Sequence, residues 1–357
     1  MKSQVYFVPA DGREPAELLA EKAKKAYLAT GLNDRIAEDE FAALKIHFGE
    51  VGNTGTIKPP WLAGLIWEVR AKTKHAFLTD SNTLYVGNRS NSIDHLRLAW
   101  SHGFTPEATG VPVIIADGLI GHDKQEPRSA QARTASSKIA SAILDSDVLL
   151  CLTHVTGHVQ TGLGAAIKNM GMGCASRAGK LDQHSVTHPR VNAKQCRNCS
   201  VCMAFCPAAA IVQAEGHVVI DPSKCIGCGE CLVVCKFGAI KMKWDEDSVR
   251  LQEKLAEYAF RVFEHFKGKA GFVNFLIQVT KDCDCMAKNQ KRIVDDIGIL
   301  ASLDPVAVDK ATADLIVKRG GGKDTLRAGY DIDWSAQLVH GEKIGLGTMK
   351  YALVELP

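Results

Sequence analysis

The 357-residue sequence lacks an apolar run of the roughly 18 residues that a membrane-spanning helix needs. Its first 15 residues hold one early lysine, a short apolar stretch and then charged residues, which is not the pattern of a signal peptide. A strong charge excess is also missing, because 43 Lys and Arg stand against 40 Asp and Glu, and no basic run argues for nucleic-acid binding. We therefore expect a soluble, cytoplasmic protein without a membrane span.

The sequence also shows no nicotinamide or flavin fingerprint. Its 46% hydrophobic and 23% charged residues are ordinary for a globular protein and exclude wholesale disorder. The length exceeds the common domain size of about 100–200 residues. We expect either two domains or a large domain with a smaller one.

Cysteine is the abundant residue that needs an explanation. Of the twelve cysteines, eight lie between Cys196 and Cys235, and the others are Cys151, Cys174, Cys283 and Cys285. Disulfide scaffolds are typically short and secreted, which this chain is not, so metal or cluster ligation is the better interpretation.

The eight clustered cysteines form an internal repeat. The spacing C-x2-C-x2-C-x3-C occurs at Cys196 and again 29 residues later at Cys225, and the shift also superimposes Ala210-Ile211 on Ala239-Ile240. A duplicated module over residues 188–244 is therefore inserted between two parts of a larger domain, residues 1–187 and 245–357.

The flanking parts alternate between strand and helix patterns, which predicts an α/β fold with a mostly parallel sheet and flanking helices. An Asp-Pro pair at Asp304 predicts the start of a helix that runs to about Lys318. The expected strands are Val5–Val8, Leu44–Phe48, Ala76–Thr79, Val111–Ala116, Val148–Thr153, Phe272–Val279, Ile297–Ser302 and Tyr351–Leu356. The expected helices before the module are Glu14–Thr30, Pro60–Lys74, Ser92–His102 and Thr134–Asp145.

The repeated spacing is typical of [4Fe–4S] ligation, in which the fourth cysteine of each copy binds the other cluster. Zinc sites usually use two C-x2-C pairs separated by a longer loop, so zinc explains the pattern less well. The segment resembles bacterial two-cluster ferredoxins, which implies a small inserted α+β domain. One cluster is assigned to Cys196, Cys199, Cys202 and Cys235, and the other to Cys225, Cys228, Cys231 and Cys206.

Two loops after expected strands suggest a further site for a metal ion or a cluster. His154 and His158 follow one strand, and Cys283 and Cys285 follow another, so the carboxyl edge of a parallel sheet would bring them together. Thiolate and imidazole suit iron, zinc or nickel. Cys174 is a candidate additional ligand, and Asp282 and Asp284 are candidates to orient ligands. Inert loop histidines and thiols, or a Cys283–Cys285 redox couple, are the alternatives, whereas Cys151 is expected in the core.

Two weaker motifs complete the pattern. Lys168 lies among glycines that would let backbone amides and an ammonium hold an anionic substrate, although a glycine-rich turn explains them equally well. Asp304 is explained by helix capping, and Asp309 lies one turn further along.

Together, the His154 loop, Lys168-Asn169, Cys283-Asp284-Cys285 and the Asp304–Asp309 segment resemble the family called domain of unknown function 362. The resemblance covers most of the chain. It implies an iron–sulfur protein of anaerobic metabolism with no assigned reaction, and members often carry a two-cluster ferredoxin module at this point.

The favoured hypothesis is a redox protein that relays electrons through two [4Fe–4S] clusters to or from a site on the α/β domain, as an oxidoreductase of unknown substrate. The alternatives are a non-catalytic electron carrier or complex subunit, and a redox or iron sensor. Its partner would be a redox protein or a small-molecule electron donor or acceptor.

Overall fold

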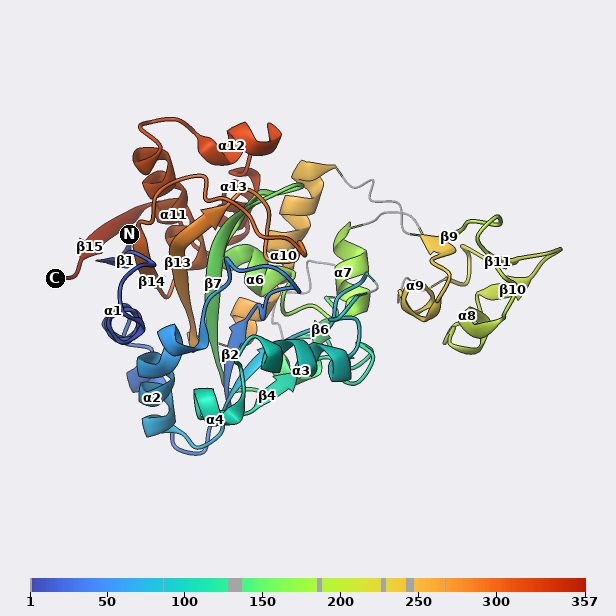
Figure 1. Cartoon of the computed structure of the whole chain (residues 1–357), viewed down its shortest axis with the longest axis horizontal. Coiled ribbons are helices and arrows are strands. Elements are labelled where there is room, and N and C mark those ends of the chain that lie inside the picture. Colours follow the sequence, from blue (N-terminus) through green and yellow to red (C-terminus); the bar gives the residue numbers. More distant parts are fainter. Residues whose placement is uncertain are drawn as a thin grey trace.

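The computed structural model describes residues 2–357 except 86, 128–136, 185–187, 226–228, 242–246 and 267 (Figure 1). Within these residues, no helix is long and apolar enough to cross a membrane.

A mixed sheet forms the centre of the molecule. Its order is β15-β1-β14-β13-β7-β2-β3-β4, with β8 paired to β7. The run from β13 through β7, β2 and β3 to β4 is parallel, and β1 is also parallel to β15, whereas β14 and β8 pair antiparallel. The prediction of a mostly parallel sheet is confirmed. The bounds are β1 Ser3–Pro9, β2 Ala42–Ile46, β3 Ala76–Asp80, β4 Val113–Ile115, β7 Val148–His158, β8 Gly162–Gly164, β13 Ala270–Thr280, β14 Gly298–Ser302 and β15 Tyr351–Glu355.

Helices cover both faces of the sheet because its central strands are apolar on both sides. In β7, Leu149 and Cys151 join the core under α6, α10 and α11, whereas Leu150 and Leu152 join the core under α1 and α2. Each fully buried large apolar side chain contributes about 1.5–3 kcal/mol. The larger helices are α1 Ala16–Ala29, α2 Ala63–Lys72, α3 Ser92–Ser101, α6 Ala166–Gly171, α7 Arg177–His184, α10 Ser248–His265, α11 Pro305–Arg319, α12 Thr325–Tyr330 and α13 Ala336–Ile344.

Local signals explain several of these bounds. Asp304 caps α11, since its side chain accepts hydrogen bonds from the backbone N–H groups of Val306 and Ala307. The helix expected over Thr134–Asp145 begins outside the described residues. Its described part is instead a short strand, β6 (Ile139–Ala140), followed by α5 (Ser141–Leu144).

The repeated segment lies beside the α/β domain, at the right of Figure 1. It contains β9 Arg190–Val191, α8 Val201–Ala204, β10 Ile211–Gln213, β11 Val218–Ile220, α9 Glu230–Val234 and β12 Ile240–Lys241. β10 pairs with β11 and β9 with β12, each antiparallel. Ser200 and Gly229 precede α8 and α9, respectively, and both have positive φ. The two copies therefore share one local structure.

Candidate functional site

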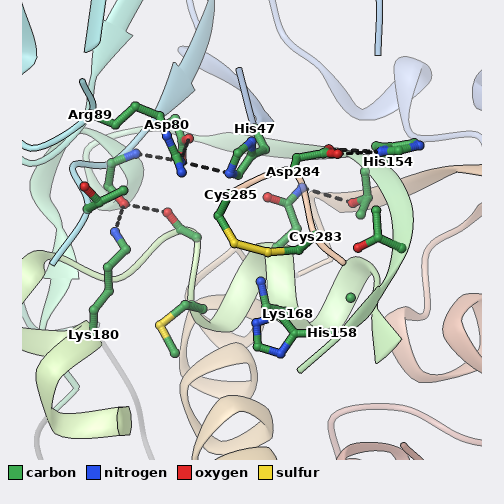
Figure 2. Close-up of a pocket in the computed structure, with 18 of the residues that line it drawn as sticks. His47, Asp80, Arg89, His154, His158, Lys168, Lys180, Cys283, Asp284 and Cys285 are labelled. Carbon is green, nitrogen blue, oxygen red and sulfur yellow. Dashed lines mark hydrogen bonds and ion pairs between the residues drawn. A yellow bond between two sulfur atoms is a disulfide. The ribbon is translucent and has the colours of Figure 1, made fainter. Parts of the chain in front are cut away.

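A cavity of about 640 Å³ opens at the carboxyl edge of the sheet, where β3, β7 and β13 end (Figure 2). Such edges are where open α/β sheets bind ligands. Loops after β7 and β13 and helix α6 supply one wall, and β2, β3 and the loop after β3 supply the other. Its polar and sulfur-containing lining includes Lys45, His47, Asp80, Arg89, His154, His158, Lys168, Lys180, Cys283, Asp284 and Cys285.

Cys283 and Cys285 are joined in a disulfide within this cavity. Cys283 is only 6% exposed, and Cys285 is half-buried. One nitrogen of His158 and the two sulfurs all lie within 4.8 Å of one another. The structure thus brings together three of the four residues predicted for the further site, from two separate strand ends.

Backbone hydrogen bonds determine the tautomer of the His158 ring. Its Nδ1 accepts the N–H groups of Gln160 and Thr161, at 3.2 and 3.1 Å. Burial, with contributions from Lys168 and His184, lowers the pKa of His158 well below its usual value. A neutral imidazole that accepts at Nδ1 carries its proton on Nε2, so His158 presents an N–H at that atom.

His154 lies apart from this group, because its ring is already engaged. Nδ1 donates to the carboxylate of Asp284 at 2.9 Å, and Nε2 donates to the Ile277 carbonyl oxygen at 2.9 Å. Burial opposes the charged ring, but Asp284 and the Ile277 carbonyl raise the net pKa of His154. The structure therefore gives His154 no free nitrogen for a metal. The remaining candidates are also placed elsewhere: Cys174 is buried outside the group, and Asp282 pairs with Lys288.

Lys168 and Lys180 are two lysines that burial affects alike, with pKa values lowered to about 8. Lys180 Nζ donates to Ser81 Oγ and to the carbonyl oxygens of Asn82 and Ala175. By contrast, no hydrogen bond or ion pair joins Lys168 Nζ to another described residue. The ammonium of Lys168 is thus available to a ligand, and the binding of an anion there stays a prediction.

The opposite wall carries a buried ionic network that sequence analysis missed. Lys45 pairs with Asp80 at 2.9 Å, and Arg89 pairs with Glu50 at 3.1 Å. Arg89 also approaches His47 Nε2 at 2.8 Å. These charges are paired with one another, so they shape the wall and leave Lys168 as the unpaired cation of the described lining. In the sequence, the signal for this network was the position of Asp80, directly after the expected strand Ala76–Thr79.

The inserted segment contains two small cavities lined by cysteines. Cys196, Cys199, Cys202 and Cys235 line the first, and Cys206, Cys225 and Cys231 line the second. Cys228, the remaining member predicted for the second set, lies outside the described residues. Each set therefore combines cysteines from both copies, as the assignment requires.

Backbone N–H groups donate hydrogen bonds to the sulfur of the fourth cysteine in each copy of the repeat. Ala210 N–H donates to Cys206 Sγ and Ala239 N–H to Cys235 Sγ, both at 3.2 Å. These two bonds are related by the sequence repeat. Such N–H···S contacts stabilise negative charge on a thiolate.

The second cysteine cavity faces the α/β domain. Gly229 lines it and approaches Leu84 so closely that a Cβ at Gly229 would lie 2.8 Å from Leu84 Cδ1. Leu84 also lines the large cavity. Beside it, the buried Glu230 forms ion pairs with Arg177, at 3.7 Å, and with His122. The large cavity and the second cysteine cavity thus share a boundary where Leu84 of one lining packs against Gly229 of the other.

Asp309 has a structural position. It accepts hydrogen bonds from the backbone of Ala166 and Ile167 and from Asn274. Burial raises its pKa to about 6. It fixes the start of α6, from which Lys168 projects. Cys151 lies in the core, as expected.

Comparison with known proteins gives one family match. The profile of the family described as "Domain of unknown function (DUF362)" matches residues 42–314. No curated protein matches the chain.

Among solved structures, the lactate racemase apoprotein from Thermoanaerobacterium thermosaccharolyticum is similar at 11% identity and a TM-score of 0.43, covering 88% of this chain and 58% of that one. A Thermotoga maritima protein is similar at 9% identity and a TM-score of 0.41, covering 92% of this chain and 59% of that one. This chain thus spans less than two thirds of the length of either protein.

Proposed function

The chain belongs to the DUF362 family, and from that premise we propose that it is an iron–sulfur redox enzyme. Two [4Fe–4S] clusters in residues 188–244 would exchange electrons with a site in the large cavity of the α/β domain. The observation that carries the proposal is the close approach of Leu84, which lines the large cavity, to Gly229, which lines the second cysteine cavity.

The donor set fits two clusters. Each cavity offers thiols from both copies, without histidine, and backbone N–H groups point at two of the sulfurs. When bound, such clusters supply one electron each at low potential. Glu230, through Arg177 and His122, holds the second cavity against the α/β domain.

The large cavity favours an enzyme over a simple carrier. A carrier has no use for a cavity of about 640 Å³ that contains, beside a cysteine pair, a half-buried ammonium with no partner among the described residues. Lys168 would attract an anionic substrate, because a cation in a partly desolvated site interacts strongly with negative charge. Because Cys283 and Cys285 line the same cavity as Lys168, their sulfurs would contact a substrate bound there.

The test is metal and sulfide analysis of protein purified under nitrogen. We expect about eight iron and eight acid-labile sulfide per chain, and a coupled paramagnetic signal after reduction with reduced methyl viologen. Zinc without sulfide would overturn the cluster assignment.

Variants separate the enzyme from the carrier. Cys283→Ser/Cys285→Ser should keep the iron and sulfide content and lose reaction at the cavity, whereas Cys151→Ala, which changes a core thiol outside the cavity, should keep both. If the double variant passes electrons to every acceptor as well as the parent does, the carrier hypothesis is the correct one.

A further inference from the structure

We infer that Cys283 and Cys285 are a redox-active dithiol, not a metal site, and that the reduced pair reduces an anionic disulfide bound at Lys168. This inference rests on the proposed function for its electrons, but its thiol chemistry can be tested separately.

The hydrogen bonds of His158 argue against a metal. A histidine that binds a metal through one ring nitrogen normally donates an N–H from the other. In this site Nδ1 of His158 already accepts two backbone N–H groups, so Nε2 carries the proton and has no free lone pair. His154 is engaged by Asp284 and Ile277 at both ring nitrogens.

Charge gives a second argument against a metal. Lys168 lines the same cavity, close enough to His158 to influence its protonation, and Figure 2 shows both side chains beside the cysteine pair. A divalent cation held by Cys283 and Cys285 would be repelled by that ammonium. Within the described group of His158, Cys283 and Cys285, the two sulfurs are the donors that remain, and a disulfide offers no thiolate.

The same surroundings suit a nucleophilic thiolate. An adjacent ammonium and a hydrogen-bond donor both favour the ionised form of a cysteine. Lys168 supplies the first, and His158, one ring nitrogen of which lies within 4.8 Å of both sulfurs, carries the N–H that would supply the second. Cys285 is the more accessible sulfur, and Cys283 is almost fully buried, so Cys285 is positioned to attack a substrate and Cys283 to resolve the adduct.

The reaction balances in electrons and atoms. The Cys283–Cys285 disulfide takes up two electrons and two protons and becomes two thiols, and two electrons is the number that two one-electron clusters hold. The Cys285 thiolate then attacks a substrate disulfide, which forms a mixed disulfide and releases one thiolate. Cys283 attacks that mixed disulfide, restores the Cys283–Cys285 bond and releases the second thiolate. Both products leave as thiols with the two protons.

The cavity indicates the class of substrate. It is large enough for two joined organic groups, at about 640 Å³, and Lys168 is its one cation without a partner among the described residues. The substrate is therefore expected to be a disulfide whose organic groups carry carboxylate or a similar negative charge.

The first test measures the redox state of the pair in the holoprotein. Under nitrogen, N-ethylmaleimide labelling and mass spectrometry should find the peptide with Cys283 and Cys285 unlabelled in oxidised protein and doubly labelled after reduction with reduced methyl viologen. A Cys199→Ser variant, which lacks one ligand of the first cysteine set, should label much less under the same reductant. A bound metal ion beyond the clusters, lost in Cys283→Ser and protecting the peptide from labelling, would overturn the inference.

The second test uses 5,5′-dithiobis(2-nitrobenzoate), an anionic disulfide, as the probe. Cys283→Ser should retain one thionitrobenzoate on Cys285, and Cys285→Ser should retain none at the pair. Lys168→Met should slow the reaction at least tenfold, whereas Lys168→Arg should restore most of it. The neutral 2-hydroxyethyl disulfide should react equally with the parent and Lys168→Met. Equal loss with both probes would refute the role of Lys168.

The two proposals fail in different ways. If iron and sulfide are absent, the proposed function fails, yet the pair reduced with dithiothreitol still reports on the dithiol. If the clusters are present and reducible but the pair never takes up label or probe, the dithiol inference alone is wrong.

Discussion

Replacing Lys168 with methionine should stabilise the folded protein at neutral pH. The cavity lowers the pKa of Lys168 from its usual 10.5 to about 8, chiefly through burial. A tenfold change in proton affinity is worth about 1.36 kcal/mol, so holding this ammonium in the folded state costs at most about 3.4 kcal/mol. Because the amine faces a cavity that opens to solvent, we expect a stabilisation of about 2 kcal/mol in Lys168→Met.

The pH dependence of this gain has a definite sign. Below about pH 8, Lys168 is protonated in both the folded and the unfolded chain, and the full cost is present. Between about pH 8 and 10.5, the unfolded chain binds the additional proton, so the stability of the parent rises with pH. The advantage of Lys168→Met should therefore be constant below pH 8 and should vanish near pH 10.5.

Thermal unfolding under nitrogen, in a buffer free of multivalent anions, is the assay. We expect a rise in the unfolding midpoint on the order of 3 °C at pH 7. Lys180→Met is the matched control, because the pKa of Lys180 is also about 8, but its amine has three hydrogen-bond acceptors that the variant would leave unpaired. That variant should be destabilised at every pH. The reasoning would be refuted if Lys168→Met were less stable than the parent at pH 7. It would also be refuted if the stability difference between variant and parent were the same at pH 7 and at pH 10.5.

Three further predictions follow from buried groups. Asp284→Asn should lower the free energy of unfolding by about 3–5 kcal/mol, because it leaves His154 buried without its carboxylate. Burial opposes ionisation of both groups, but their pairing raises the pKa of His154 and lowers the pKa of Asp284. In urea unfolding the difference from the parent should therefore be largest between about pH 4 and 6.5 and smaller on either side; a difference that does not vary with pH would contradict this. Gly171→Ala should cost about 1–3 kcal/mol in the same assay, because a Cβ would lie 2.3 Å from the Leu255 carbonyl oxygen of α10; a neutral effect would show that α6 and α10 separate easily. Glu230→Gln should weaken the contact of the inserted segment with Arg177 and His122 and make residues 188–241 more sensitive to limited proteolysis, with iron content unchanged; unchanged cleavage would contradict a role for this carboxylate in docking.

Much of the fold was predictable from local patterns. The central strands are continuous apolar runs, as expected for strands that are buried on both faces, and β7 and β13 begin within two residues of their expected starts. The cap at Asp304 was readable because its side chain acts within three residues. The carboxyl-edge rule also brought His158, the last residue of β7, to the loop with Cys283, since the rule depends only on strand direction.

The details of the cavity depended on contacts between distant segments. His154 and His158 both follow the expected strand, so the sequence does not show which of them reaches the cysteines. In the structure β7 continues to His158, and the register of β13 against β7 shifts between Phe275 and Thr280. That irregularity brings the Ile277 carbonyl oxygen within hydrogen-bonding distance of His154. No sequence spacing encodes such a shift. Similarly, Lys45 lies in a buried strand and pairs with Asp80 of a neighbouring strand, so neither residue signals the other locally.

The pairing of β9 with β12 has a consequence for how the chain assembles. β7 and β13 are neighbours in the sheet, but about 110 residues separate them, so folding must close a long loop. Joining the two ends of the inserted segment removes about half of that loop. Because closure entropy grows only with the logarithm of length, this saves merely about 0.6 kcal/mol. The central sheet therefore gains little free energy if the inserted segment assembles with iron and sulfide before the sheet forms. If the proposed clusters bind there, we expect a newly made chain to complete the cavity of its α/β domain first and to acquire iron and sulfide afterwards, at a segment held beside a finished scaffold.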